Sequence, residues 1–160
     1  MNNSQKIGSV RGVTTITYGF LYFQEAYGNL VDWSDDPLME GKKVITSGYL
    51  SEGDGYLRVE SAGHTLLAEV EIQAWDREPP LELTEWEISA DAFLKLRSGF
   101  IIAYGMDGEA IGEDLVIGPA GAISNVRVYC RGRQRLREIH DDFDFDEIQE
   151  EYLAQFWPAP

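Results

Sequence analysis

The sequence has few of the residues on which most enzymes and metal sites depend. Its 160 residues include one cysteine, Cys130, and two histidines, His64 and His140. A single cysteine cannot form an internal disulfide and suits a reducing compartment, so we expect a cytoplasmic protein. No apolar run reaches the ~18–20 residues of a membrane span. Residues 1–12 are polar and contain no apolar core of a secretory signal, so we expect none.

Positive charge is also scarce. The chain has 13 lysines and arginines against 28 aspartates and glutamates, which gives a net charge of −15 at pH 7. Such a field repels nucleic acid and anionic lipid and attracts basic proteins. We therefore expect no nucleic-acid partner, no membrane partner and, if there is a protein partner, a basic one. The alternative is that the acidity serves solubility alone.

Motifs that organise catalysis are missing. The sequence contains no GxSxG, P-loop or GxGxxG pattern. His140 precedes several aspartates, but the glycine and closing glutamate of a calcium loop are absent there. Strand alternation places Cys130 on the same face as Val126 and Val128, which predicts a buried and unreactive thiol. We expect a protein that is not an enzyme, with no cofactor and no resident metal.

What the sequence does contain is a succession of short alternating segments separated by glycine, proline and serine turns. Hydrophobic residues make up 44% of the chain and aromatic residues 12%, enough for a sizeable core. The pattern predicts an all-β fold, an antiparallel two-sheet β-sandwich of jelly-roll-like character with few short helical turns. We expect one domain, 1–160, with 1–12 flexible. The expected strands are 13–23, 44–50, 56–60, 64–75, 84–90, 99–104, 113–117, 123–131 and 152–157.

Two of these strands have the clearest patterns. In 64–75, alternation predicts a core face and a mostly solvent face; the core face consists of Leu66, Ala68, Val70, Ile72 and Ala74. In 84–90, the expected inward residues are Trp86, Ile88 and Ala90. The segment 118–133 ends in a cluster of arginines, and the C-terminal run 151–160 is its expected partner in a sheet.

Charge separates sharply near the C-terminus. The arginine cluster comprises Arg127, Arg131, Arg133, Arg135 and Arg137, and the stretch 138–151 that follows is acidic and contains no basic residue. Its carboxylates, interleaved with apolar residues, have a spacing that can imitate a phosphate backbone in the basic cleft of a nuclease. The alternative is an acidic loop that folds over the arginines of its own chain. The candidate contact residues here are Asp141, Asp142, Asp144 and Asp146.

A second acidic group surrounds a tryptophan. Trp33 is flanked by Asp32, Asp35 and Asp36. An aromatic side chain ringed by carboxylates is typical of an interface anchor. The alternative is a half-buried tryptophan that fixes a loop to the core.

Parts of the chain resemble known families. The region 18–57 resembles the competence protein J family, which inhibits a competence nuclease. The resemblance rests on Tyr18-Gly19-Phe20, Val31-Asp32-Trp33-Ser34-Asp35, Glu40-Gly41-Lys42 and Ser47-Gly48-Tyr49. It implies a small, cytosolic, β-rich protein that acts by binding, with Asp32, Trp33 and Asp35 as inhibitor-like positions. The C-terminal half, with Pro79-Pro80, Trp86, 118–121, 126–133 and 152–160, is similar to an uncharacterised bacterial β-protein family with no activity to transfer.

These observations favour a non-enzymatic cytoplasmic binding protein, an inhibitor or immunity protein of a basic partner such as a nuclease or toxin. The alternative is a structural or interaction β-domain in a homo-oligomer or larger assembly. Either a monomer or a homodimer fits the sequence. A sugar-binding or small-molecule sandwich would rest on the fold alone.

Overall fold

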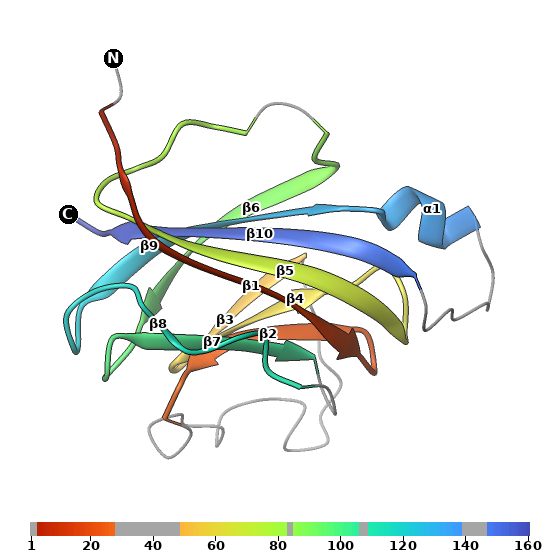
Figure 1. The fold of residues 1–160 in the computed structure, drawn as a ribbon, viewed down its shortest axis with the longest axis horizontal. Coiled ribbons are helices and arrows are strands. Elements are labelled where there is room, and N and C mark those ends of the chain that lie inside the picture. Colours follow the sequence, from red (N-terminus) through yellow and green to blue (C-terminus); the bar gives the residue numbers. More distant parts are fainter. Residues whose placement is uncertain (1–2, 28–48, 83–84, 106–108, 139–146) are drawn as a thin grey trace.

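Two five-stranded sheets pack against each other and form the protein core (Figure 1). The computed structural model describes residues 3–27, 49–82, 85–105, 109–138 and 147–160. Sheet A has the order β1-β5-β10-β9-β6, with β1 (Lys6–Ile16), β5 (Leu66–Trp75), β10 (Ile148–Pro158), β9 (Ile123–Arg131) and β6 (Ile88–Lys95). Sheet B has the order β3-β4-β2-β7-β8, with β3 (Leu50–Gly53), β4 (Tyr56–Glu60), β2 (Phe20–Glu25), β7 (Phe100–Gly105) and β8 (Leu115–Val116). Helix α1 (Arg133–Glu138) follows β9 at one end of the sandwich.

The expected all-β, two-sheet sandwich is confirmed, with one pair of strands that departs from it. The C-terminal strand β10 pairs antiparallel with β9, as expected, and Tyr152 lies opposite Cys130. On its other side β10 pairs with β5 in parallel, with Tyr152 opposite Val70. Sheet A is therefore mixed, because the chain enters β5 and β10 from the same end of the sandwich.

Alternation along β5 fills the core as its sequence predicts. All five residues of its predicted core face have no exposed surface, and they pack with β2 residues such as Leu21 and Phe23 from sheet B. Each fully buried Leu, Ile, Val or Phe side chain stabilises the fold by about 1.5–3 kcal/mol relative to exposure. One continuous cluster thus links the inner faces of both sheets.

The first expected strand, 13–23, is wrong as a single element. A turn divides it, because Tyr18 and Gly19 adopt positive φ values of 61° and 78°. There the chain leaves β1 in sheet A and enters β2 in sheet B. The strand β1 also begins at Lys6, so residues 6–12, expected to be flexible, are paired with β5. Small glycines at positions 8 and 12 hide the strand pattern, and Gly12 leaves room for the Ile111 side chain, 3.1 Å from where a Cβ would lie.

The strand expected at 84–90 is displaced toward the C-terminus. The structure places β6 at Ile88–Lys95, with Ala92 and Leu94 buried. Trp86, expected on the core face, lies before the strand and packs on Tyr129 with 5.7 Å between ring centroids. Because Trp86 precedes β6, strand alternation does not assign it to the core face, and it packs beside Tyr129 of β9. Residues 44–48 of another expected strand lie outside the described residues, and β3 begins at Leu50.

The turn between β9 and α1 yields a test of the fold. Gly132 has φ of 96°, and a Cβ there would lie 2.2 Å from the backbone oxygen of Gln149. Gly132→Ala is therefore expected to lower the unfolding free energy by at least about 2 kcal/mol, from backbone strain and the clash together. Gly121→Ala is the control, because its φ of 81° is similar but no atom lies within 4 Å of a Cβ. Urea unfolding should show a smaller loss for the control; equal losses would mean that the close approach to β10 does not exist.

Candidate functional site

The residues proposed from the sequence as partner contacts lie outside the described part of the chain. These are Asp32, Trp33, Asp35, Asp36, Asp141, Asp142, Asp144 and Asp146. They remain predictions, and His140 lies in the same undescribed segment as the last four. What the structure places is the arginine cluster beside them and the end of the acidic stretch that leads into β10.

Arginines of the cluster contact carboxylates of their own chain. Arg135 Nη2 lies 3.0 Å from Glu147, and Arg131 contacts Glu151. Arg131 also reaches Glu85 at 2.8 Å. The described end of the acidic stretch therefore packs on the arginines, as one of the two interpretations of the sequence held. Arg131 and Arg135 are therefore paired with carboxylates of the chain itself.

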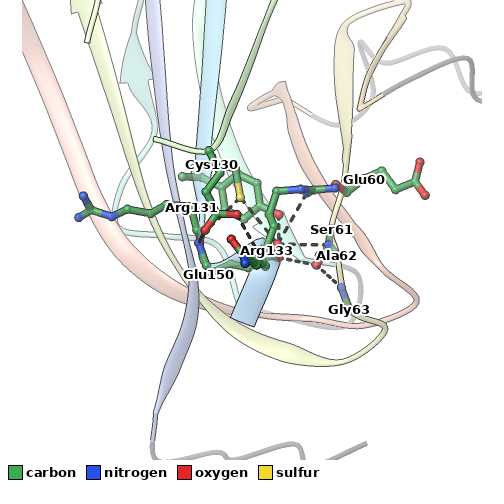
Figure 2. A network of polar contacts seen from close by, with 12 residues as sticks. Glu60, Ser61, Ala62, Gly63, Cys130, Arg131, Arg133 and Glu150 are labelled. Carbon is green, nitrogen blue, oxygen red and sulfur yellow. Dashed lines mark hydrogen bonds and ion pairs between the residues drawn. The ribbon is translucent and has the colours of Figure 1, made fainter. Parts of the chain in front are cut away.

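Glu150 is the most deeply placed of these carboxylates (Figure 2). It stands on the inward face of β10 with 0% of its surface exposed. Its oxygens accept hydrogen bonds from the Ser61 hydroxyl, from the Ala62 backbone N–H at 3.1 Å and from the Tyr152 hydroxyl at 2.9 Å. Arg133 Nη1 lies 3.7 Å from the carboxylate. A buried ion needs such partners, because its lost hydration must be replaced.

Arg133 connects this buried group to a turn of the opposite sheet. Its Nη1 donates to the Glu60 carbonyl at 2.8 Å, and its guanidinium lies over the Tyr49 ring at 5.2 Å. In Figure 2 the Arg133 side chain extends toward the turn Glu60–Gly63, whereas Arg131 points to the other side. The network thus fastens α1 and the start of β10 to the end of β4, and its role is structural.

Cys130 lies in the same network and is buried, as predicted from its alternation with Val126 and Val128. Burial raises the pKa of the Cys130 thiol well above its ordinary value, and the adjacent Glu150 carboxylate raises it further. The thiol therefore stays neutral, whereas a nucleophilic cysteine must be a thiolate. Burial likewise raises the pKa of the Tyr152 hydroxyl.

Other candidates for chemistry are dispersed in the described ranges. His64 is exposed, as expected, and packs edge-on against the Tyr18 ring at 5.3 Å. Among the described residues, no three histidine, cysteine, aspartate or glutamate side chains converge as a metal site. No helix in those ranges is both long and apolar enough to cross a bilayer.

The outer face of sheet A carries a groove that sequence reasoning missed. It has a volume of about 630 Å³ and lies along β6, β9 and the end of β10; its principal side chains are Glu52, Asp91, Phe93, Arg127, Trp157 and Pro158. We call it the β6 groove. Arg127 is 7% exposed and forms ion pairs with Asp91 at 2.9 Å and Glu78 at 3.0 Å. Phe93 is 58% exposed beside this pair.

The signal for this groove was present but ambiguous. Phe93 falls in a segment, 91–97, whose pattern fits neither a strand nor a helix clearly. Because the expected strand ends at Ala90, the sequence pattern assigns Phe93 to neither face of a sheet. Its exposure follows from its place opposite Asn125 in the β6–β9 ladder, on the side away from Ala92 and Leu94.

Comparison with known proteins supports the fold. No family model matches the sequence, and neither does any curated protein. Among solved structures, the chain is similar to a protein described as crocagin biosynthetic gene J, with a TM-score of 0.63 and 13% identity over 99% of this chain and 100% of that one. It is also similar to ComJ of Bacillus subtilis, described as an inhibitor of the DNA-degrading activity of NucA, with a TM-score of 0.58 and 7% identity over the same shares. At such identities the similarity shows the fold alone, and it confirms the resemblance to competence protein J at that level over nearly the whole chain.

The buried network predicts unequal roles for two adjacent glutamates. Glu150→Ala is expected to lower the unfolding free energy by about 3 kcal/mol, because it leaves the buried Arg133 and several donors without their acceptor. Glu151→Ala removes an ion pair of partly exposed side chains on the outer face and is expected to cost less than about 1 kcal/mol. Urea denaturation of both variants measures the difference; a similar cost for the two would contradict the structural role of Glu150.

The state of Cys130 can be tested by thiol labelling. At pH 8 the folded protein should not react with Ellman's reagent within an hour, because the thiol is buried and neutral. After unfolding in urea, the one cysteine should react fully. Rapid labelling of the folded protein would show that Cys130 is accessible.

Proposed function

We propose that this protein is a non-enzymatic cytoplasmic binding protein that inhibits, or confers immunity to, a basic partner such as a nuclease or toxin. One observation carries the proposal: the chain has a net charge of −15, so its acidic residues outnumber the basic residues that could pair with them and acidic charge is left for a partner. Ion pairs with the protein's own carboxylates are formed by Arg11, Arg77, Arg97, Arg127, Arg131, Arg133 and Arg135. Electrostatic steering by such a surface speeds the capture of a basic protein.

The fold adds a second line of support. ComJ, with which this chain shares its sandwich, is described as an inhibitor of a nuclease. A nuclease presents a basic cleft to its phosphate substrate, and a surface of carboxylates fits that cleft. The buried, neutral state of Cys130 also favours a protein that acts by binding, since the thiol is not available as a nucleophile.

The proposed contacts are the two acidic segments of the chain. Trp33, with Asp32, Asp35 and Asp36, supplies an aromatic anchor among carboxylates. Asp141, Asp142, Asp144 and Asp146 supply four charges within six residues of the sequence. In the sequence they fall between α1 and β10, two elements that Arg133 and Glu150 connect to the sandwich.

A charge-reversal variant tests these contacts. Asp141→Lys, Asp142→Lys and Asp144→Lys together change the net charge from −15 to −9. The matched control reverses Glu109, Glu113 and Asp114, which are exposed, lie outside both acidic segments in the sequence and give the same net charge. With partner captured from a lysate of the source cells, we expect the first variant to bind at least tenfold more weakly and the control to bind within about threefold of wild type. Equal losses would show that only total charge matters, and no loss would remove the segment from the interface.

The alternative, a structural β-domain in a homo-oligomer, is favoured by one feature. The strand β6 is at an edge of sheet A and carries the exposed Phe93. Edge strands of this kind are sites of association between chains. Size-exclusion chromatography at several salt concentrations distinguishes the two: a stable homo-oligomer without a basic partner supports the structural role.

A further inference from the structure

We propose that the β6 groove binds an arginine side chain presented by an exposed segment of the basic partner. This inference rests on the proposed function and adds to it a contact surface made of described residues, separate from the two acidic segments. The guanidinium would lie against the Phe93 ring and donate hydrogen bonds to the carboxylates of Asp91 and Glu52.

The groove is open at the place where such a side chain would enter. Phe93 stands on the outer face of β6, an edge strand of sheet A, and 58% of its surface is exposed. Asp91 precedes it by two residues on the same face, roughly 7 Å along the strand. Glu52 approaches from β3 of the other sheet, and its carboxylate accepts the backbone N–H of Phe93 at 2.9 Å. An aromatic ring and two carboxylates therefore line the same groove at the edge of the sandwich.

The ionised side chains that line the groove carry an excess of negative charge, which attracts a cation. Its one basic lining residue is Arg127, whereas Glu52, Glu78 and Asp91 are acidic. Asp91 contacts Arg127 through one oxygen, yet its side chain is 66% exposed. A carboxylate offers about four lone-pair sites, so Asp91 can accept a second guanidinium without releasing Arg127. Glu52 is exposed and adds a further acceptor.

The protein itself shows how such a group is held. In the floor of the groove, the Arg127 guanidinium lies 5.2 Å from the centre of the Trp157 ring while Asp91 and Glu78 accept its hydrogen bonds. Arg131 lies over Trp86 at 4.7 Å and pairs with Glu85 in the same way. A partner arginine over Phe93, paired with Asp91 and Glu52, would repeat this arrangement on the solvent side of Arg127. Arginine suits the site better than lysine because its planar group stacks on a ring and bonds two carboxylates at once.

A short peptide can probe the groove without knowledge of the partner. We would titrate the ¹⁵N-labelled protein with acetyl-Arg-Arg-Arg-amide at low salt and follow the amide signals of Phe93 and the side-chain amide of Asn125, which lines the groove. Phe93→Ala and Glu52→Gln should each weaken binding about two- to fivefold, through loss of the ring and of one carboxylate. Glu113→Gln is the matched control, because it removes the same charge as Glu52→Gln at an exposed site outside the groove and should leave binding unchanged. The corresponding trilysine peptide should bind more weakly than triarginine.

The result that overturns the inference is equal affinity of wild type, Phe93→Ala and Glu52→Gln, since the peptide would then bind only to diffuse negative charge. Absence of shifts at Phe93 and Asn125 would overturn it as well. The inference would also be overturned if the same signals shifted when the protein concentration was raised without peptide, because a second copy of the protein would then occupy the groove. Partner capture from the lysate is a separate measurement: if it fails while the peptide binds as expected, the proposed function is rejected and the arginine site is retained.

Discussion

The position of the last strand governs the rest of this structure. Strand β10 is the final segment of the chain, yet it lies in the middle of sheet A between β5 and β9. Its inner residues Tyr152, Ala154 and Phe156 fill the centre of the core. Neither neighbouring strand can bury its inner face until β10 is inserted, so the two halves of the sheet form cooperatively. A fold of such non-local pairings has a high contact order and is expected to form slowly for its size.

The same strand sets the electrostatic pattern of the molecule. Alternation along β10 sends Glu150 into the core, where it contacts Arg133 of α1, and Glu151 to the outer face, where it contacts Arg131 at the end of β9. A buried carboxylate is costly and adds little net stability, but its partners fix the position of the turn at 61–63 and of α1. Because these arginines are held internally, the remaining acidic residues dominate the exposed charge. The proposed attraction of a basic partner would draw on this exposed acidic charge.

The sequence predicted those features that follow from strict alternation. The five inward residues of β5, the burial of Cys130 and the pairing of β9 with β10 all follow from a two-residue period with apolar side chains on one face. The prediction from sequence was wrong where this two-residue period is obscured. Glycines hide the beginning of β1, apolar residues on both sides of Gly19 hide the turn at Tyr18-Gly19, and Trp86 packs on Tyr129 before β6 begins. The inward placement of Glu150 could not be inferred, since a glutamate in a strand normally faces solvent.

The β6 groove was missed for a related reason. Its principal side chains come from four separate strands, and the ladder that puts Phe93 opposite Asn125 joins two of them, β6 and β9. The local pattern of 91–97 is too ambiguous to predict such a site. The acidic segments, by contrast, are visible in sequence because their charges adjoin, and they remain predictions about residues outside the described ranges.

The central claim, that this acidic sandwich binds a basic protein, is tested most directly by the salt dependence of affinity. The partner captured from source cells would be purified, identified by mass spectrometry and titrated against this protein by calorimetry at increasing sodium chloride. We predict a stoichiometric complex with a basic protein whose dissociation constant rises more than about tenfold between low and several-hundred-millimolar salt, as charges are screened. A partner with no basic character, an affinity insensitive to salt, or recovery of this protein with itself alone would contradict the account.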